Sequence, residues 1–283
     1  MSLAPTLPSN GESIFRKYGT IFSVCLSERL TYRTDFFFAT LMRFLPLVSI
    51  AFLWTAVFAA SDSTRIAGFT RDEMVAYNLL VFISRAFSSM PGLAMGIATD
   101  IREGGIKKYL TQPINMIGFL FTSRVAHKLV YYLLATIPFA IVIYLGRDFF
   151  PGWPSAPIFI LFLFTLLMGF LIGFLFETLI GLIAFWTLEI TSLSYMLMSV
   201  VFILSGHMFP LDLFPQPIAA FVKWLPFQYF AYFPSMLFLH GDSMTTGQLW
   251  FEVLRMIGMA LVLAIIVRTM YRSGIRHYSA FGG

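Results

Sequence analysis

The ionisable side chains of this chain favour binding over bond chemistry. Its histidines, His127, His207, His240 and His277, lie far apart and lack the spacing of metal ligands. The sequence contains no G-x-x-x-x-G-K-[ST] segment for nucleotide phosphates, and no H-E-x-x-H or G-x-S-x-G segment of a hydrolase. We therefore expect no catalytic residue, no metal site and no enzyme activity. If ATP drives the function, a partner chain must bind the ATP and its Mg²⁺.

Residues 100–113, DIREGGIKKYLTQP, are a charged segment between two apolar stretches. Gly104 and Gly105 permit a sharp bend, and residues 106–110 can form one helical turn that Pro113 ends. A short charged helix between two membrane spans is a natural docking surface for a soluble protein. The alternative is an interfacial loop whose Lys and Arg only satisfy the positive-inside rule.

Residues 205–241 are rich in Phe, Trp and Tyr, and Asp212 and Lys223 are their only formal charges. Prolines cut this segment into pieces shorter than the about 20 residues of a spanning helix, and an interior proline costs a helix about 3 kcal/mol. Non-helical backbone at membrane depth persists only when protein buries it or it lines a cavity. We therefore predict two short re-entrant helices within residues 209–248, the outer block. In this interpretation the aromatic side chains seal a translocation path across the membrane. The alternative is that the block braces the fifth and sixth spans. The sealing residues would be Phe209, Phe227, Tyr229 and Phe230.

The composition is that of an integral membrane protein. Charged residues make up only 12% of the chain and the mean hydropathy is +0.81, whereas soluble domains carry about 25% charged residues. In so apolar a chain, the net charge of +5 indicates cytoplasmic loops beside anionic lipid rather than a nucleic-acid partner. Cys25 is the only cysteine, so no disulfide can form within the chain.

We expect an all-α fold with six transmembrane helices. Residues 1–35 would be a cytoplasmic tail with an amphipathic interfacial helix, because apolar residues recur at helical spacing from Ile14 to Leu26. Residues 36–271 would form the membrane domain, and residues 272–283 a second cytoplasmic tail. The six spans would cover residues 36–60, 73–98, 117 or 123 to 145, two segments within 158–208, and 249–271.

The distribution of Lys and Arg predicts the orientation. Of the 19 basic residues, 12 lie on the side of the termini and of residues 99–116, five lie on the other side, and Arg43 and Arg85 lie within spans. The positive-inside rule then places both termini in the cytoplasm and the outer block outside a plasma (bacterial inner) membrane. Glu177 and Glu189 flank the reversal between the fourth and fifth spans, where they contact a partner or pair with loop arginines; the alternative is plain solvation.

Arg85 lies deep within the second predicted span. A charge at that depth costs about 2.5–3.5 kcal/mol on insertion scales, so it faces protein or water. It either contacts a polar or anionic substrate or holds helices together. For Arg43, near the end of its span, we favour snorkelling to the membrane surface. The glycine pairs Gly92/Gly96 and Gly169/Gly173 predict close helix approaches.

Residues 101–113 resemble the loop of ABC-2-type permeases, in which a charged pair, Gly, an aliphatic residue, Leu and Pro follow in this order. Lys107 departs from the acidic or polar residue that many members carry there. The outer segment is similar too, in Ser205-Gly206, Phe209-Pro210, Phe214-Pro215, Leu225-Pro226 and Pro234. The resemblance is closest to the multidrug-type export branch. The residues of the loop that match are Arg102, Glu103, Gly104, Ile106, Leu110 and Pro113.

The resemblance implies a permease subunit that pairs with an identical or homologous permease and with two ABC ATPase subunits. The loop of residues 99–116, including Gly105 and Lys107, would couple the ATPase to the membrane helices. Such a subunit exports amphipathic or apolar substrates, such as drug-like molecules, lipids or lipid-linked glycans, by alternating access. The competing hypotheses are a channel or scaffold without an ATPase, and a membrane enzyme that acts on lipid.

Overall fold

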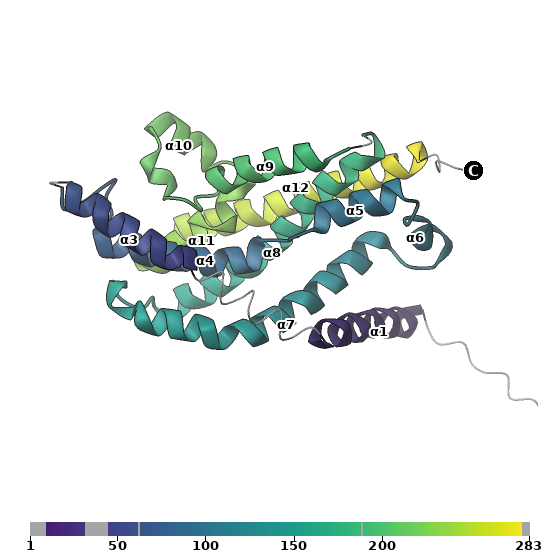
Figure 1. Cartoon of the computed structure of the whole chain (residues 1–283), viewed down its shortest axis with the longest axis horizontal. Helices are drawn as coiled ribbons and strands as arrows, with labels where there is room; N and C mark the ends of the chain where they lie inside the picture. The colour runs from purple at the N-terminus through teal and green to yellow at the C-terminus, as the bar shows by residue number, and fades with distance from the viewer. Residues whose placement is uncertain (1–9, 32–44, 62, 188, 279–283) are drawn as a thin grey trace, which may run out of the picture. The chain divides into compact units, whose positions relative to one another are not determined.

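The computed structural model describes residues 10–31, 45–61, 63–187 and 189–278 (Figure 1). These residues form helices and turns, with one isolated antiparallel bridge between Ile66 and Phe69. The prediction of an all-α chain is therefore confirmed for the described residues. The chain divides into two compact units, Met1–Arg43 with Lys107–Pro138 (unit 1) and Phe44–Ile106 with Phe139–Gly283 (unit 2).

Unit 1 contains α1 (Asn10–Thr31), α6 (Lys107–Thr111) and most of α7 (Met116–Leu145). The predicted N-terminal helix is present as α1. The Lys17 ammonium donates a hydrogen bond to the Pro113 carbonyl oxygen at 2.6 Å, and Tyr18 packs so closely on Gly118 that an added Cβ would lie 2.6 Å from the tyrosine oxygen. These contacts attach α1 to the connection between α6 and α7 and to the first turn of α7.

Unit 2 contains the end of α7 and all the remaining helices. Its α-helices are α3 (Leu45–Ala60), α4 (Arg71–Ser88), α5 (Leu93–Arg102), α8 (Ala156–Leu182), α9 (Thr191–Leu204), α10 (Gln216–Val222), α11 (Tyr232–His240) and α12 (Thr246–His277). Its short 3₁₀ helices are η1 (Arg147–Phe149), η2 (Ile183–Phe185), η3 (Leu211–Leu213), η4 (Pro226–Phe230) and η5 (Gly241–Ser243). Two short α-helices, α10 and α11, therefore lie in the outer block.

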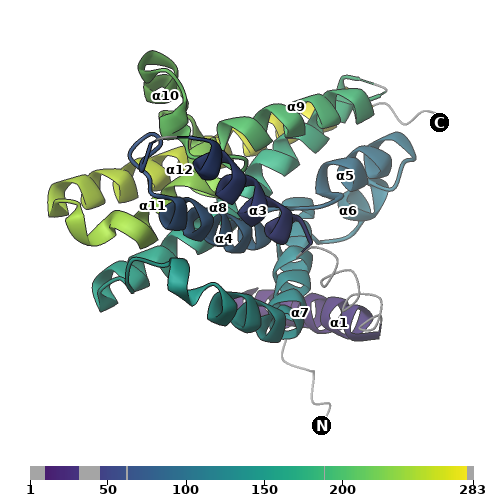
Figure 2. The same cartoon turned by 60° about the vertical axis from the view of Figure 1, so that its left-hand side comes forward.

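The α8 helix is the centre of unit 2, and α4, α5, α11, α12 and η4 all pack on it (Figure 2). Gly169 and Gly173 let other backbone segments approach it. A Cβ added at Gly169 would lie 2.9 Å from the carbonyl oxygen of Tyr229, and one at Gly173 would collide with that of Ser88. The prediction for this glycine pair is confirmed. At Gly92 and Gly96 no described atom lies within 4 Å of an added Cβ, so the prediction of a close approach there is wrong.

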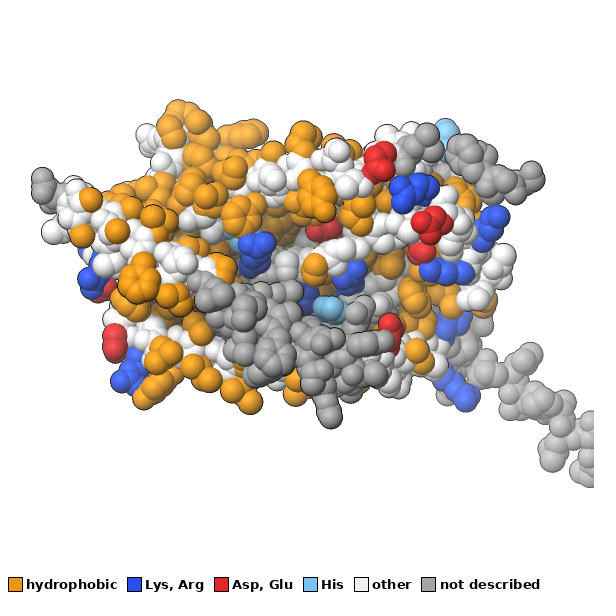
Figure 3. All heavy atoms as spheres, in the orientation of Figure 1, with side chains coloured by type: hydrophobic (Ala, Val, Ile, Leu, Met, Phe, Trp, Pro, Cys, Tyr) orange, Lys and Arg blue, Asp and Glu red, His pale blue; other side chains and the backbone are white. Residues whose placement is uncertain are grey.

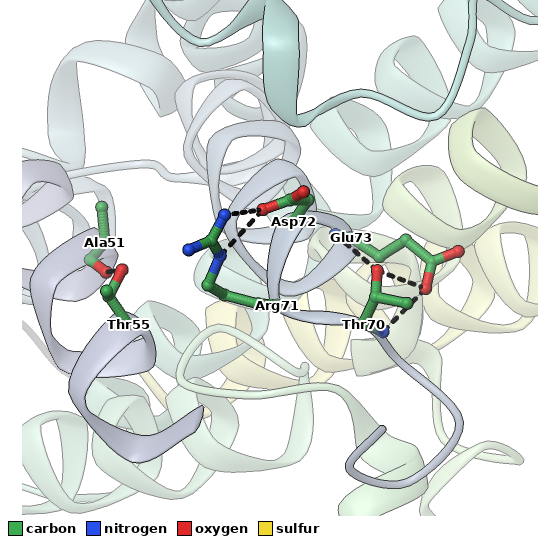
Figure 4. Close-up of polar contacts among 6 residues, drawn as sticks. All are labelled: Ala51, Thr55, Thr70, Arg71, Asp72 and Glu73. Atoms are coloured by element: carbon green, nitrogen blue, oxygen red, sulfur yellow. Dashed lines mark hydrogen bonds and ion pairs between the residues drawn. The ribbon is translucent and has the colours of Figure 1, made fainter. Parts of the chain in front are cut away.

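The start of α4 is fixed by its own side chains (Figure 4). The Glu73 carboxylate accepts the Thr70 backbone N–H at 2.8 Å, and the Thr70 hydroxyl accepts the Glu73 backbone N–H at 3.3 Å. This reciprocal capping box satisfies two of the N–H groups that a helix start leaves open, and capping of this kind contributes about 1 kcal/mol. The short polar loop after α3 therefore ends, and the next membrane segment begins, at Arg71.

The second predicted span, residues 73–98, is two helices rather than one. Ser89 follows α4 in an extended conformation, φ −72° and ψ 137°, and Gly92 precedes α5 at a left-handed φ of +71°. Pro91 explains the break, because proline lacks an N–H and disfavours helical geometry in the residue before it. The end of α4 is held at the break by a hydrogen bond from the Ser88 hydroxyl to the Phe230 carbonyl oxygen, at 3.2 Å.

Within the described residues, four segments are long and apolar enough to cross a membrane: Arg71–Arg102, Met116–Leu145, Ala156–Phe185 and Thr246–His277. The described parts of the other two predicted spans are shorter, with 16 residues in α3 and 14 in α9. At 1.5 Å per residue these helices extend about 24 and about 21 Å, less than the about 30 Å of a hydrocarbon core. Residues 36–44 of the first predicted span, including Arg43, lie outside the described residues.

Candidate functional site

The loop after α5 makes the sharp bend that its glycines predict. The Glu103 N–H donates to the Thr99 carbonyl oxygen at 2.9 Å, and the chain then turns through Gly104 at a φ of +80°. A left-handed φ of this kind strains any residue with a Cβ. The Ile106 N–H returns to the Asp100 carbonyl oxygen at 2.9 Å, and the Ile106 side chain is fully buried. The bend is therefore a fixed structure that presents Arg102 and Glu103 at its surface.

The predicted helical turn of residues 106–110 is present as α6, which begins one residue later. Within unit 1, Tyr109 is buried and packs on Phe119 with ring centroids 5.5 Å apart. Lys107, Leu110 and Pro113 are exposed. The helix thus has one anchored face and one open face with a charge and an apolar side chain, which is the composition expected of a docking helix.

The structure brings together two predicted site residues that are far apart in the sequence, Arg102 and Glu189. An Arg102 guanidinium nitrogen lies 3.5 Å from a Glu189 carboxylate oxygen. The hydrogen bonds of Glu189 with Thr191, and then the charge of Arg102, hold the pKa of Glu189 below its ordinary value, so this carboxylate is ionised at neutral pH. Of the alternatives considered for Glu189, the structure shows the pairing with a loop arginine. Glu177 lies instead inside α8, where its side chain is half-buried.

Tyr229 anchors the outer block to α12. Its fully buried hydroxyl donates to the Glu252 carboxylate at 3.0 Å and accepts from the Arg255 guanidinium at 2.9 Å. Arg255 also pairs with Glu252 at 2.6 Å and lies 5.2 Å from the centroid of the Trp224 ring. Ion pairs that are mostly shielded from water require such additional partners to be stable. Sequence reasoning missed Glu252 and Arg255; their spacing of three residues on one helix was the only local signal.

Phe227 and Phe230 flank Tyr229 in η4, and both pack on α8. Their ring centroids lie 5.1 and 6.5 Å from that of Phe176 and 6.1 Å from one another. Phe230 is buried, whereas Phe227 is half-buried. Three of the four predicted sealing residues therefore lie together. Phe209 is separate from them and packs on Phe214, with centroids 5.3 Å apart.

The two charges of residues 205–241 pair with one another. The Lys223 ammonium binds the Asp212 carboxylate, which also accepts the Tyr232 hydroxyl at 2.8 Å. The Lys223 side chain is only 32% exposed. The Tyr77 hydroxyl of α4 donates to the Gly206 carbonyl oxygen at 2.6 Å at the start of the same segment. The segment that leads into the outer block is thus joined to α4.

Arg85 is exposed on α4 and approaches α9. Its guanidinium carbon lies 4.9 Å from the centroid of the Phe202 ring, a distance at which a cation and an aromatic face attract. The His207 ring stacks on the Phe202 ring, with ring centroids 5.2 Å apart. The His207 Nδ1 is hydrogen-bonded to the Ser205 hydroxyl. A cation and a stacked aromatic pair therefore line one face where α4 meets α9.

Comparison with known protein families identifies the family of the chain. The family model described as ABC-2 family transporter protein matches residues 44–282, well over half of the 283 residues. The chain therefore belongs to the ABC-2 transporter family, whose members are membrane components of transporters and are not themselves catalytic. Membership implies association with ABC ATPase components. No curated protein matches the chain.

Proposed function

We propose that the chain is the transmembrane permease subunit of an ATP-driven exporter that moves amphipathic or apolar substrates by alternating access. The observation that carries this proposal is the fixed, charged bend after α5, with Gly104 at its corner, in an ABC-2 chain without a nucleotide-binding motif. Such a chain needs a surface on which a separate ATPase can act. Drug-like molecules, lipids and lipid-linked glycans are the substrates that the resemblance to multidrug-type export permeases implies.

In this proposal the complete transporter has two permeases, identical or homologous, and two ABC ATPase subunits that bind ATP and Mg²⁺. Six spans, which include the segments of α3 and α9, cross the plasma membrane. The termini and the α5–α6 loop then lie in the cytoplasm, and the outer block lies outside as a pair of re-entrant helices. The excess of Lys and Arg on the side of the loop, 12 against five, supports this orientation.

The path would run along the face where α4 meets α9. Arg85 there offers a cation to a polar or anionic headgroup, while the Phe202 ring offers apolar contact. In the outer block, Tyr229 and Phe230 are buried and serve as the anchor, whereas Phe209 and Phe227 keep partly exposed rings that can close the path. In this proposal Glu177 and Glu189 lie towards the cytoplasmic side of the membrane.

Purification of the tagged chain from its native membranes in mild detergent tests the coupling role. We expect an ABC ATPase subunit to copurify with ATP hydrolysis activity. Glu103→Ala removes an exposed carboxylate, and Gly104→Pro forces the left-handed corner to a negative φ. Both should lower assembly or stimulated ATP hydrolysis several-fold while the permease stays in the membrane at its normal level.

Asp148→Ala is the matched control for this measurement, because it removes a carboxylate whose side chain is 87% exposed in η1, away from the loop in sequence. It should leave ATP hydrolysis unchanged. Normal coupling in both loop variants would place the docking role elsewhere. A purified, folded chain that carries no ATPase at all would support the channel or scaffold hypothesis instead.

A further inference from the structure

We propose that the turn between α8 and α9, represented by Trp186, Thr187 and Glu189, is a second docking surface for the same ATPase subunit, and that the ion pair of Arg102 with Glu189 sets its register relative to the α5–α6 loop. This inference rests on the proposed function, and it adds a contact surface that neither the charged loop nor membership of the family assigns.

The turn is open to solvent. Trp186 is 45% exposed, the Glu189 side chain is 61% exposed, and Thr187 between them is exposed as well. A large exposed indole beside an ionised carboxylate is typical of a contact surface, since Trp is enriched among residues that contribute most to binding. Arg102 and Glu103 lie beside it, joined to the turn by the ion pair. The two surfaces are therefore continuous.

A shared core lies beneath the two surfaces. Ile190, immediately after Glu189, is 3% exposed and belongs to a buried cluster with Ala94, Ala98 and Ile180. Ala94 and Ala98 come from α5, whose end forms the charged bend, while Ile180 comes from α8. Because protein interiors are close-packed and resist deformation, α5 and the turn should move together when either is pushed.

The C-terminal end of α12 joins the same assembly. An added Cβ at Gly274 would collide with the Phe185 ring, and the Tyr278 and His277 rings lie 6.1 and 6.2 Å from those of Phe185 and Trp186. Figure 1 shows the end of α5, the α8–α9 connection and the yellow end of α12 at one end of unit 2. Acidic and basic side chains gather over this end in the space-filling view (Figure 3).

This arrangement connects the turn directly to the proposed path. The α9 helix begins at Thr191, immediately after the buried Ile190, and carries Phe202, the ring on which Arg85 lies. A partner that pulls on the turn would therefore displace the wall of the path through one short helix. A partner with both acidic and basic side chains would fit the surface, because Arg102, Glu103 and Glu189 are all exposed.

Site-specific photocrosslinking in the assembled transporter tests the second surface. A photoreactive residue at Thr187 should crosslink to the ATPase subunit, as should one at Glu103, whereas one at Ser243 in η5 should not. Crosslinking from Glu103 without crosslinking from Thr187 overturns this inference and leaves the proposed function intact. A chain that crosslinks to an ATPase from neither Glu103 nor Thr187 overturns both.

Charge reversal tests the ion pair separately. Arg102→Glu and Glu189→Arg should each lower stimulated ATP hydrolysis several-fold at unchanged membrane levels, because each places like charges together. The double variant should recover to within about twofold of the original, since an exposed pair depends on charge complementarity more than on exact shape. A double variant as defective as the worse single variant would show that the pair does not set the register.

Discussion

Gly169 and Gly173 of α8 are among the most restrictive single positions in unit 2. Gly169 faces the Tyr229 carbonyl and Gly173 faces the Ser88 carbonyl. The outer block and the break between α4 and α5 therefore both pack on the side of α8 that carries these glycines. No hydrophobic driving force brings helices together in lipid, which leaves close packing as a main source of their association. A side chain at either glycine would push apart backbone segments that cannot rotate away.

Gly173→Ala tests this close approach. Its Cβ would collide with a backbone oxygen, and overpacking of this kind typically costs about 1–3 kcal/mol. We expect the midpoint of thermal unfolding in detergent to fall by several degrees. Gly96→Ala is the matched control, because no described atom lies within 4 Å of its added Cβ and alanine favours a helix. Equal midpoints for the two variants would contradict the packing account.

Residue patterns predicted the local features of the site but not its long-range partners. The left-handed corner at Gly104 and the turn of α6 follow from a glycine pair and a nearby proline. The hydrogen bond between Tyr229 and Glu252 joins residues 23 apart in sequence, and the path of the chain between them decides it. The helical spacing of residues along the chain does not predict a contact of this kind. The ion pair of Asp212 with Lys223 was not predicted either, although these are the only formal charges of residues 205–241.

At the scale of elements, the outer block is a braced structure with a partly free aromatic face. Polar contacts join it to α4 through Ser88 and to α12 through Glu252 and Arg255. These contacts brace the block against the second and sixth predicted spans, whereas the alternative that we considered was bracing of the fifth and sixth. This bracing still allows a gate, because Phe227 remains half-buried beside its anchored neighbours and can respond to movement of α8.

Accessibility of Phe227 distinguishes a gate from a passive brace. In a Cys25→Ser background, Phe227→Cys should react with a membrane-impermeant maleimide at rates that differ several-fold between the nucleotide-free transporter and the transporter trapped with ATP and vanadate. Ser243→Cys, exposed in η5, should react equally in both states. Equal rates at Phe227 would leave only the bracing role.

The break in the second predicted span shows why element boundaries are harder to predict than element types. By length and apolar composition the whole segment Arg71–Arg102 still qualifies as one span. The proline and the left-handed Gly92 were visible in the sequence. The hydrogen bond from the Ser88 hydroxyl to Phe230, which holds the end of α4 at the break, is a tertiary contact that the local sequence does not predict.

At the scale of the whole molecule, the account depends on orientation. The charged bend, the α8–α9 turn and the end of α12 can meet an ATPase only if they lie in the cytoplasm. The two long connections that carry η1 and the outer block must then lie outside. The excess of basic residues predicts this arrangement, and the four long apolar helices are consistent with it.

Cysteine labelling in intact cells measures that orientation directly. In a Cys25→Ser background, Asp148→Cys and Asp242→Cys should react with an impermeant maleimide, whereas Lys108→Cys and Ser9→Cys should react only after the membrane is permeabilised. Permeabilised cells show that each site is reactive once it is reached. Labelling of Lys108→Cys in intact cells would place the proposed coupling helix outside and contradict the account.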